Sequence, residues 1–377
     1  MQANSDITTA MFITSLGSDT VMSTKGNSLS FRPLPFSAAA ITFLTIVVIV
    51  TGIVFVSSLL ILNQNHTAIA QQLQQQTQQQ QEQALASEYI SFGIDNVTFS
   101  HHMASVNGIQ LHYVIGGHGD PVVLLHGWPE TWYEWRHVMP ALAKNYTVIV
   151  PDLRGLGDSS KPLTGYDGKT TAEDIHQLVS QLGFKDIFLV GHDFGVQVAY
   201  SYAAAHPNEV RRLVILDVPI PGIGPGQNIT GLWWAQFHMV RDVPEMLVEG
   251  HEMEYLSWFY RYTCNPAAIT KEDIDEYVSH YTSPGGMRAG FEYYRALFDD
   301  IKQNKEYSMV KLQMPVLAMG GKCSFGSAAL ESMRLLATNV SGGVVPDSGH
   351  WIAEERPRFF TEQLFAFFGS NTTNIIK

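Results

Sequence analysis

The sequence is short of charge, of basic residues in particular, and of cysteine. Charged residues make up 15% of the 377 positions, and the formal net charge is −12. The few lysines and arginines form no basic patch, so nothing in the charge pattern supports binding to nucleic acid. Two cysteines, Cys264 and Cys323, are too few for a disulfide framework or a cysteine-built metal site, and we interpret both as structural.

Charge is missing altogether from one long stretch near the N-terminus. Residues 37–62 are 26 consecutive uncharged positions rich in Ile, Val and Leu. A helix needs roughly 20 such residues to cross a bilayer, so we predict a transmembrane signal anchor at 37–62. A signal peptide cleaved near Ala70 is one alternative. A buried core helix is another, although core helices are normally shorter and keep a polar face.

Basic residues near the two ends of this segment predict its orientation. Lys25 and Arg32 precede it, whereas the first basic residue after it is Arg136. The positive-inside rule then predicts a cytoplasmic tail over residues 1–36 and a large domain outside the cytoplasm.

Glutamine dominates the segment that follows the predicted anchor. Residues 71–83 contain ten glutamines and neither glycine nor proline. Such a tract has no apolar face to bury, so we expect residues 63–88 to form a solvated linker. A glutamine-rich helical stalk is the alternative for the same residues.

Beyond residue 88 short β-branched runs alternate with helical periodicity. The predicted strands are 109–115, 122–125, 147–150, 187–190, 213–216, 316–319 and 340–345. The predicted helices are 132–143, 171–182, 195–205, 327–337 and 357–368. This alternation is typical of an α/β fold with a mostly parallel sheet covered on both faces. Ligands of such sheets bind beyond the carboxyl ends of the strands, so the residues after each strand are the candidates for a site.

Polar motifs follow several of these strands. They are His-Gly-Trp-Pro-Glu at 126–130, Asp-Leu-Arg-Gly-Leu-Gly-Asp-Ser at 152–159, Gly-His-Asp-Phe-Gly at 191–195, Asp217, and Ser-Gly-His-Trp at 348–351. The motif around Asp193 has the small-x-nucleophile-x-small form of a nucleophile elbow, a strained turn that projects its central side chain into a cleft. A glycine-flanked turn whose aspartate caps a helix is the alternative interpretation.

With these motifs in this order, residues 95–370 resemble the α/β-hydrolase superfamily, and within it the branch of epoxide hydrolases and dehalogenases with an aspartate nucleophile. The resemblance implies a mostly parallel eight-stranded sheet with a helical cap inserted after the sixth strand. The core would then comprise residues 89–218 and 307–377, and the cap residues 219–306. We expect neither a cofactor nor a metal ion.

An aspartate at the elbow restricts the reaction. Attack by Asp193 on an ester carbonyl would give an unproductive anhydride, whereas attack on an electrophilic sp³ carbon gives an alkyl ester that water can hydrolyse. The leaving group is then an epoxide oxygen or a halide. His350 is the predicted base that activates water. The backbone N–H groups of Trp128 and Phe194 are the predicted oxyanion hole.

The third member of the catalytic triad requires a choice. Many relatives carry an acid after the seventh strand, but residues 319–325 contain no carboxylate. Fluoroacetate dehalogenases and some haloalkane dehalogenases place the acid after the sixth strand instead, where this sequence has Asp217. We therefore assign the acid to Asp217. Asp347 is a rival that lies very close to His350 along the chain.

Cap residues distinguish an epoxide from a halide as the leaving group. An epoxide oxygen leaves as an alkoxide and needs an acidic O–H donor. Residues 286–295 resemble the second tyrosine region of soluble epoxide hydrolases, which implies Tyr294 as a donor. The position of the first tyrosine holds His238. Trp234 is a further expected contact of the substrate, and with Trp233 it leaves halide binding open.

Features of dehalogenases fit less well. Haloalkane dehalogenases usually carry Trp where this chain has Phe194, and fluoroacetate dehalogenases carry two arginines at the positions of Phe194 and Gln197. We therefore predict a hydrolase that opens a small apolar epoxide with water. A haloalkane or haloacid dehalogenase with the same triad is the first alternative, and a non-catalytic ligand-binding module is the second.

Overall fold

The computed structural model describes residues 49, 51–52 and 91–369. Among these residues, no helix combines the length and the apolar character that a membrane crossing requires. The predicted anchor at 37–62 lies outside the described residues except for positions 49, 51 and 52, and the linker at 63–88 lies wholly outside them. Both therefore stay predictions.

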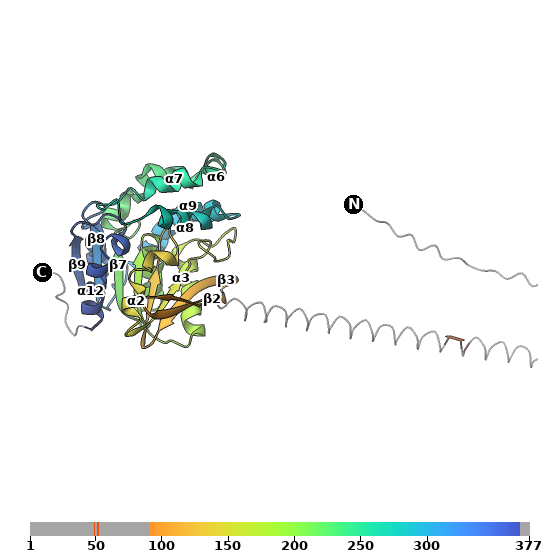
Figure 1. Ribbon diagram of the computed structural model, residues 1–377, viewed down its shortest axis with the longest axis horizontal. Coiled ribbons are helices and arrows are strands. Elements are labelled where there is room, and N and C mark those ends of the chain that lie inside the picture. Colours follow the sequence, from red (N-terminus) through yellow and green to blue (C-terminus); the bar gives the residue numbers. More distant parts are fainter. Residues whose placement is uncertain (1–48, 50, 53–90, 370–377) are drawn as a thin grey trace, which may run out of the picture. The chain divides into compact units, whose positions relative to one another are not determined.

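One nine-stranded sheet runs through the described part of the main domain (Figure 1). Its strands are β1 (Ser91–Ile94), β2 (Val97–Val106), β3 (Ile109–Gly117), β4 (Asp120–Leu125), β5 (Tyr146–Pro151), β6 (Ile187–His192), β7 (Val210–Leu216), β8 (Val316–Gly321) and β9 (Val340–Val345). Their order is β1-β2-β3-β5-β4-β6-β7-β8-β9. Pairing is antiparallel as far as β5 and parallel from β5 to β9.

The seven predicted strands are confirmed, and β1 and β2 are additional to them. The resemblance implied eight strands, and the ninth is β1, a four-residue strand that pairs with β2 at the edge of the sheet. β1 and β2 carry polar residues among their apolar ones because one face of this antiparallel ribbon is partly open to solvent.

Alternate residues of the central strands bury their side chains on opposite faces of the sheet. Val123 and Leu125 of β4 belong to one apolar cluster, and Val122 and Leu124 belong to a second. Since both sets are fully buried, β4 is apolar from Pro121 to Leu125, as expected for a strand covered on both faces.

Helices of the core cover both faces. They are η1 (Trp132–Trp135), α2 (Met139–Leu142), α3 (Gly168–Gln181), α4 (Phe194–Ala205), α10 (Ala328–Leu336), α11 (Ile352–Glu355) and α12 (Pro357–Gly369). Residues of α3, α4 and α10 join the first apolar cluster, whereas residues of α2, α11 and α12 join the second. The prediction of one helix over 132–143 is wrong. Pro140 lies in the first turn of α2, and in a continuous helix its ring would clash with the carbonyl of Arg136.

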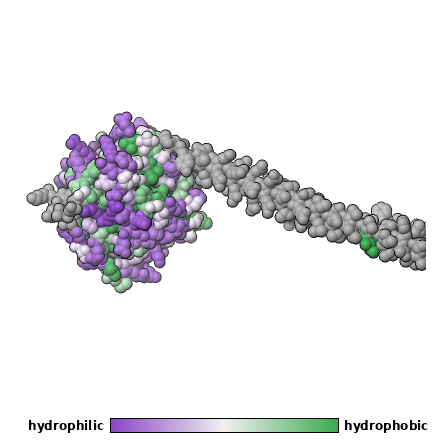
Figure 2. Space-filling view, turned by 90° about the horizontal axis from the view of Figure 1, so that it is seen from below, coloured by the Kyte–Doolittle hydropathy of each residue, from purple (hydrophilic) through white to green (hydrophobic). Residues whose placement is uncertain are grey.

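Between β7 and β8 the chain leaves the sheet and forms a helical cap. Its elements are η2 (Gly224–Gly231), α5 (Trp233–Met239), α6 (Val243–Val248), α7 (Glu252–Phe259), α8 (Lys271–Tyr281) and α9 (Gly286–Tyr307). Figure 1 shows α6, α7, α8 and α9 gathered on one side of the core. Seen from the opposite side, the surface carries mostly hydrophilic side chains with scattered hydrophobic ones (Figure 2).

Candidate active site

Asp193 stands at the sharp turn between β6 and α4. Its φ of 48° and ψ of −118° form a strained backbone conformation that a non-glycine residue rarely adopts. The flanking glycines permit the turn: a Cβ on Gly191 would lie 2.3 Å from the carbonyl oxygen of Gly195, and one on Gly195 would lie 2.3 Å from that of Leu125. Any larger side chain would open the turn and move the carboxylate.

The two oxygens of the Asp193 carboxylate have different neighbours. The backbone N–H of Trp128 donates to Oδ1 at 2.9 Å, and Oδ2 lies 3.6 Å from Nε2 of His350. Phe194 opens α4, so its amide belongs to a helix N-terminus. Oδ1 is therefore the oxygen with hydrogen-bond support, and Oδ2 is the one that faces the imidazole.

Asp217 orients that imidazole. Oδ2 of this fully buried carboxylate lies 2.5 Å from Nδ1 of His350. Because a carboxylate accepts hydrogen bonds, Nδ1 is the donor of this pair, and Nε2 is the ring nitrogen that faces Asp193. The Ser324 hydroxyl also donates to Asp217 at 2.7 Å, and the Gly321 N–H donates at 2.9 Å.

The structure thus brings together the three residues assigned to the triad. The rival Asp347 has a side chain that is 82% exposed and pairs with Arg356 at 3.1 Å. The hydrogen bond from Ser324 to Asp217 was not predicted. Its only signal in the sequence is the position of Ser324 in the segment where many relatives carry the acid.

His192, next to the nucleophile, binds elsewhere. Its Nε2 donates to the backbone carbonyl of His350 at 2.9 Å, and its Nδ1 lies 3.0 Å from Glu134 and 3.4 Å from Glu130. Burial disfavours a charged imidazole, but the two glutamates outweigh it and raise the pKa of His192 well above its usual value. Burial and the charge of Glu134 raise the pKa of Glu130 to about 8. Through its bond to the His350 carbonyl, His192 therefore supports the loop that carries His350.

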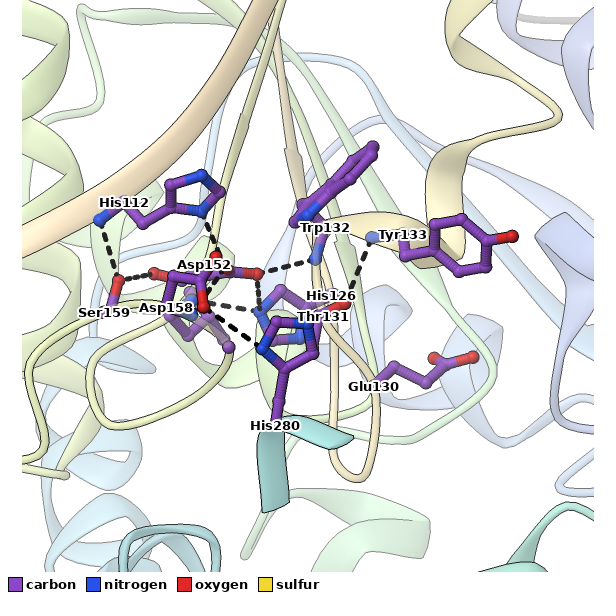
Figure 3. A network of polar contacts seen from close by, with 12 residues as sticks. His112, His126, Glu130, Thr131, Trp132, Tyr133, Asp152, Asp158, Ser159 and His280 are labelled. Carbon is purple, nitrogen blue, oxygen red and sulfur yellow. Dashed lines mark hydrogen bonds and ion pairs between the residues drawn. The ribbon is translucent and has the colours of Figure 1, made fainter. Parts of the chain in front are cut away.

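A second buried network holds the loop that carries Trp128 (Figure 3). Asp152, at the end of β5, accepts hydrogen bonds from Nδ1 of His112 at 2.7 Å and from the Trp132 N–H at 2.8 Å. Burial would raise the pKa of Asp152, but the charge and hydrogen bond of His112 lower it well below the ordinary value. His126 accepts the Leu153 N–H at 3.0 Å. Both ends of the loop are thereby tied to the strand beneath it.

A cavity of about 270 Å³ opens above Asp193, between core and cap. Its wall includes aromatic and aliphatic side chains such as Trp234, Phe259 and Leu297. Asp193 is the only carboxylate on this wall, and it is accompanied there by His350 but by no lysine or arginine of the described chain. Such a cavity is suited to an uncharged, mainly apolar ligand.

Tyr294 of α9 lies on the cavity wall, next to Phe194 of the elbow. Its ring packs edge-on against those of Trp128 and Phe194, with centroids 5.4 and 4.8 Å apart. Burial, together with the charge of Asp193, raises the pKa of the Tyr294 hydroxyl well above its usual value. Its hydroxyl is therefore protonated at neutral pH and is available as a donor.

His238 of α5 packs behind Tyr294, with ring centroids 4.3 Å apart. Its Nε2 lies 2.5 Å from the hydroxyl of Tyr255, and its ring is fully buried. Burial and the charge of Arg295 lower the pKa of His238 to about 3, so the ring is neutral. His238 thus adjoins the cavity without forming its wall, whereas the other expected cap contact, Trp234, does line it. Tyr255 was not singled out in the sequence.

The two cysteines form one disulfide bond, which the sequence did not reveal. Cys264 follows α7 in the cap, and Cys323 follows β8 in the core, 59 residues later. Cys323 also lies on the cavity wall. The bond therefore fixes the cap to the core beside the catalytic groups.

Besides a partly exposed grouping of Glu173, His176 and His206, two groupings among the described residues contain side-chain types that metal ions also use, and both are buried except for Asp158. They are His112 with Asp152 and Asp158, and Glu130 with Glu134 and His192. In both groupings the imidazole already forms an ion pair with a carboxylate of the same grouping. We interpret them as structural networks of the kind described above.

Comparison with known proteins identifies relatives of the whole hydrolase region. The family profile described as alpha/beta hydrolase fold matches residues 120–357. A soluble epoxide hydrolase from Corynebacterium sp. (strain C12) is 40% identical over 279 residues, which are 71% of this chain and 97% of that protein.

Solved structures agree with this similarity. The epoxide hydrolase CorEH without ligand superposes with a TM-score of 0.68 at 39% identity, over 72% of this chain and 98% of that one. The Cif epoxide hydrolase from Acinetobacter nosocomialis superposes with a TM-score of 0.67 at 26% identity, over 77% of this chain and 95% of that one.

Proposed function

The chain belongs to the α/β-hydrolase family as an epoxide hydrolase-like enzyme, and from this premise we propose that it opens epoxides to vicinal diols through a covalent ester on Asp193. One observation carries the proposal. The Asp193 carboxylate lies between the Trp128 N–H and the His350 imidazole, at the wall of an apolar cavity.

In the first half-reaction, Oδ2 of Asp193 attacks a ring carbon of the epoxide. The carbon–oxygen bond of the ring breaks, and the oxygen takes a proton from the Tyr294 hydroxyl as it leaves. His238 is neutral and packs against the ring of Tyr294, so it supports the position of that ring and brings no charge to the leaving oxygen. The product is a hydroxyalkyl ester on Asp193.

In the second half-reaction, water attacks Cγ of the ester. Nε2 of His350 removes a proton from that water, while Asp217 stabilises the imidazolium that forms. Oδ1 becomes the oxyanion, and the Trp128 and Phe194 amides stabilise it. When this intermediate collapses, the alkoxide leaves from Cγ and takes the proton of the added hydroxyl, which releases the diol and regenerates the carboxylate. The proton on His350 returns to the tyrosinate through solvent.

The substrate class follows from the wall of the cavity. An uncharged epoxide with an apolar substituent meets rings and aliphatic chains there, and its only polar atom faces Tyr294. A haloacid would need a cation for its carboxylate, and none of the wall residues provides one. A small aryl epoxide such as styrene oxide is therefore a suitable first substrate.

Turnover of styrene oxide by the purified protein tests the proposal. We expect a diol product from the parent protein and none from Asp193→Ala. Equal diol formation by the two proteins would refute a covalent role for Asp193, and release of halide from haloalkanes without any epoxide opening would favour the dehalogenase.

We also propose that residues 37–62 anchor the protein in a membrane with the hydrolase outside the cytoplasm. The support is the uncharged run with Lys25 and Arg32 before it. The disulfide between Cys264 and Cys323 adds to it, because such bonds persist mainly in oxidising compartments.

Fractionation of cells that produce the full chain tests this location. We expect the uncleaved protein in the membrane fraction, and we expect protease added to intact cells to remove the hydrolase. Recovery of the full-length protein without detergent would contradict the anchor. A protein shortened to begin near residue 71 would favour cleavage and secretion.

A further inference from the structure

Three segments that are distant in sequence meet beside the catalytic histidine. They are the cap segment 262–265 after α7, the loop 321–324 after β8, and the loop 348–351 that carries His350. Glu355, at the end of α11, lies where the cap segment meets the histidine loop and is buried there. Nothing in the mechanism above gives this carboxylate a role.

The Glu355 carboxylate accepts hydrogen bonds from both sides of this junction. On the cap side, Oε2 accepts from the Thr263 hydroxyl at 2.6 Å, from the Cys264 N–H at 2.7 Å and from the Asn265 N–H at 3.0 Å. On the other side, Oε1 accepts from the Gly349 N–H at 2.8 Å. Gly349 directly precedes the catalytic histidine.

Backbone contacts continue the same junction. The N–H of His350 donates to the carbonyl of Tyr262 at 2.9 Å. The approach is so close that a Cβ on Gly349 would lie 2.5 Å from this carbonyl oxygen. The backbone of the catalytic histidine is therefore held by the cap as well as by its own loop.

The disulfide adds a third connection that does not involve Glu355. It fixes Cys264 to Cys323, and the Cys323 N–H donates to the Ser348 carbonyl at 3.0 Å. The adjacent Ser324 is the residue that donates to Asp217. Movement of the cap segment would thus displace both His350, the base of the triad, and Asp217, its acid.

We propose that Glu355 is a positioning residue for His350, which holds the histidine loop against the cap segment so that Nε2 meets the water attacking the ester. The proposal rests on the proposed function, since it concerns the hydrolysis of the Asp193 ester. It assigns Glu355 to the second half-reaction alone, because alkylation requires Asp193 and Tyr294 but no base.

The variant E355Q tests this role. An amide offers one acceptor oxygen in place of two and turns an NH₂ group toward a backbone N–H, so it cannot hold both sides. We expect single-turnover hydrolysis of the ester to slow about 10- to 100-fold, the effect of a small displacement of a catalytic group. Formation of the ester should proceed at the parent rate.

Asp174→Asn is the matched control. Asp174 is also a buried carboxylate, but it binds Arg154 at 2.6 and 2.7 Å, and neither residue lies on the cavity wall. We expect this variant to lower the melting temperature without changing the ratio of the two half-reactions. A purely structural role for Glu355 would give the same pattern in E355Q.

Thr263→Val removes one hydrogen-bond donor to Glu355 and leaves the Glu355 carboxylate in place. This variant replaces E355Q as the test if E355Q does not fold. Loss of this hydrogen bond should slow ester hydrolysis about fivefold. If the parent protein forms the ester and the variants hydrolyse it as fast as the parent protein does, the proposed role of Glu355 is wrong. If the parent protein forms no ester on Asp193, the proposed function fails instead.

Discussion

The core and the cap form opposite walls of one cavity, and they do so by different means. The core contributes Asp193 and His350: Asp193 stands at the turn directly after β6, and His350 lies in the loop between β9 and α11. The cap contributes aromatic rings such as Trp234, Phe259 and Tyr294, placed by the packing of three helices against one another.

This difference separates the chemistry of the enzyme from its choice of substrate. Strained backbone at Asp193 and Asp217, with φ of 48° and 66°, fixes the reactive groups within the core itself. In the proposed mechanism, the cap determines which epoxide fits and how its oxygen is protonated. Changes at His350 and Asp217 in the core should therefore affect the rate of ester hydrolysis, and changes at Tyr294 in the cap should affect formation of the ester.

The largest effect is expected from Asp217→Asn in the core. The amide keeps the shape of the side chain but no longer stabilises an imidazolium, so ester hydrolysis should slow about 10³- to 10⁴-fold. Ser324→Ala removes one hydrogen bond from Asp217 and should slow it only about fivefold. Single-turnover kinetics measures both, and hydrolysis at the parent rate in Asp217→Asn would remove Asp217 from the triad.

The next effect concerns the covalent connection between the two regions. Replacing both Cys264 and Cys323 by serine removes a disulfide bond that closes a loop of 59 residues. By the loop-entropy relation, this loss should lower the free energy of unfolding by about 4 kcal/mol. Thermal unfolding with and without a reductant measures this. The reductant should also make the two thiols titratable, which verifies that the bond is reduced. If the melting temperature of the reduced parent protein is then unchanged, the bond does not stabilise the fold.

Tyr294→Phe tests the contribution of the cap. Loss of the phenolic proton should slow ester formation about 10²-fold while ester hydrolysis is unchanged. Tyr293→Phe is the control, because the hydroxyl of Tyr293 donates to the Arg154 carbonyl instead of facing the cavity. If both variants form the ester at the parent rate, the donor is another group, and His238 is the next to replace.

The smallest effect concerns an ion pair that joins cap to core. Nδ1 of His280 lies 3.2 Å from Asp158 and its Nε2 lies 3.5 Å from Glu276. Burial lowers the pKa of this imidazole, but the two carboxylates outweigh burial and raise it to about 10.

A raised pKa in the folded protein means that the stabilisation is complete below about pH 6.5, the ordinary value for histidine. It is then lost as the pH rises toward 10. Because Asp158 is half exposed, we expect only about 1 kcal/mol. His280→Gln should remove this part of the pH dependence in urea unfolding, and His118→Gln, in an exposed turn, should not. Identical pH profiles for His280→Gln and the parent would contradict the ion pair.

The sequence predicted the core far better than the cap. Buried strands such as 122–125 and the motif around Asp193 are local patterns, since apolar runs and glycine spacing depend on neighbouring residues. The elbow, His350 and Asp217 follow from where each residue stands relative to a strand end. β1 and β2 escaped prediction because polar residues interrupt their apolar pattern.

Contacts between distant segments were not predictable. Two cysteines in a sequence carry no information on whether they meet, and the pairing of Cys264 with Cys323 depends on how the cap lies on the core. The bonds of Glu355 to the cap segment and of His238 to Tyr255 arise in the same way. Helix packing, which no local pattern specifies, decides them.

Mass spectrometry of His350→Gln after incubation with styrene oxide tests the central claim most directly. Without the base, Asp193 should still attack the epoxide, and the ester should accumulate because water is no longer activated. We predict that the peptide containing Asp193 gains the mass of one substrate molecule, and that the same peptide of the parent protein does not retain it. An unmodified peptide in a folded variant that binds the substrate would contradict the covalent mechanism.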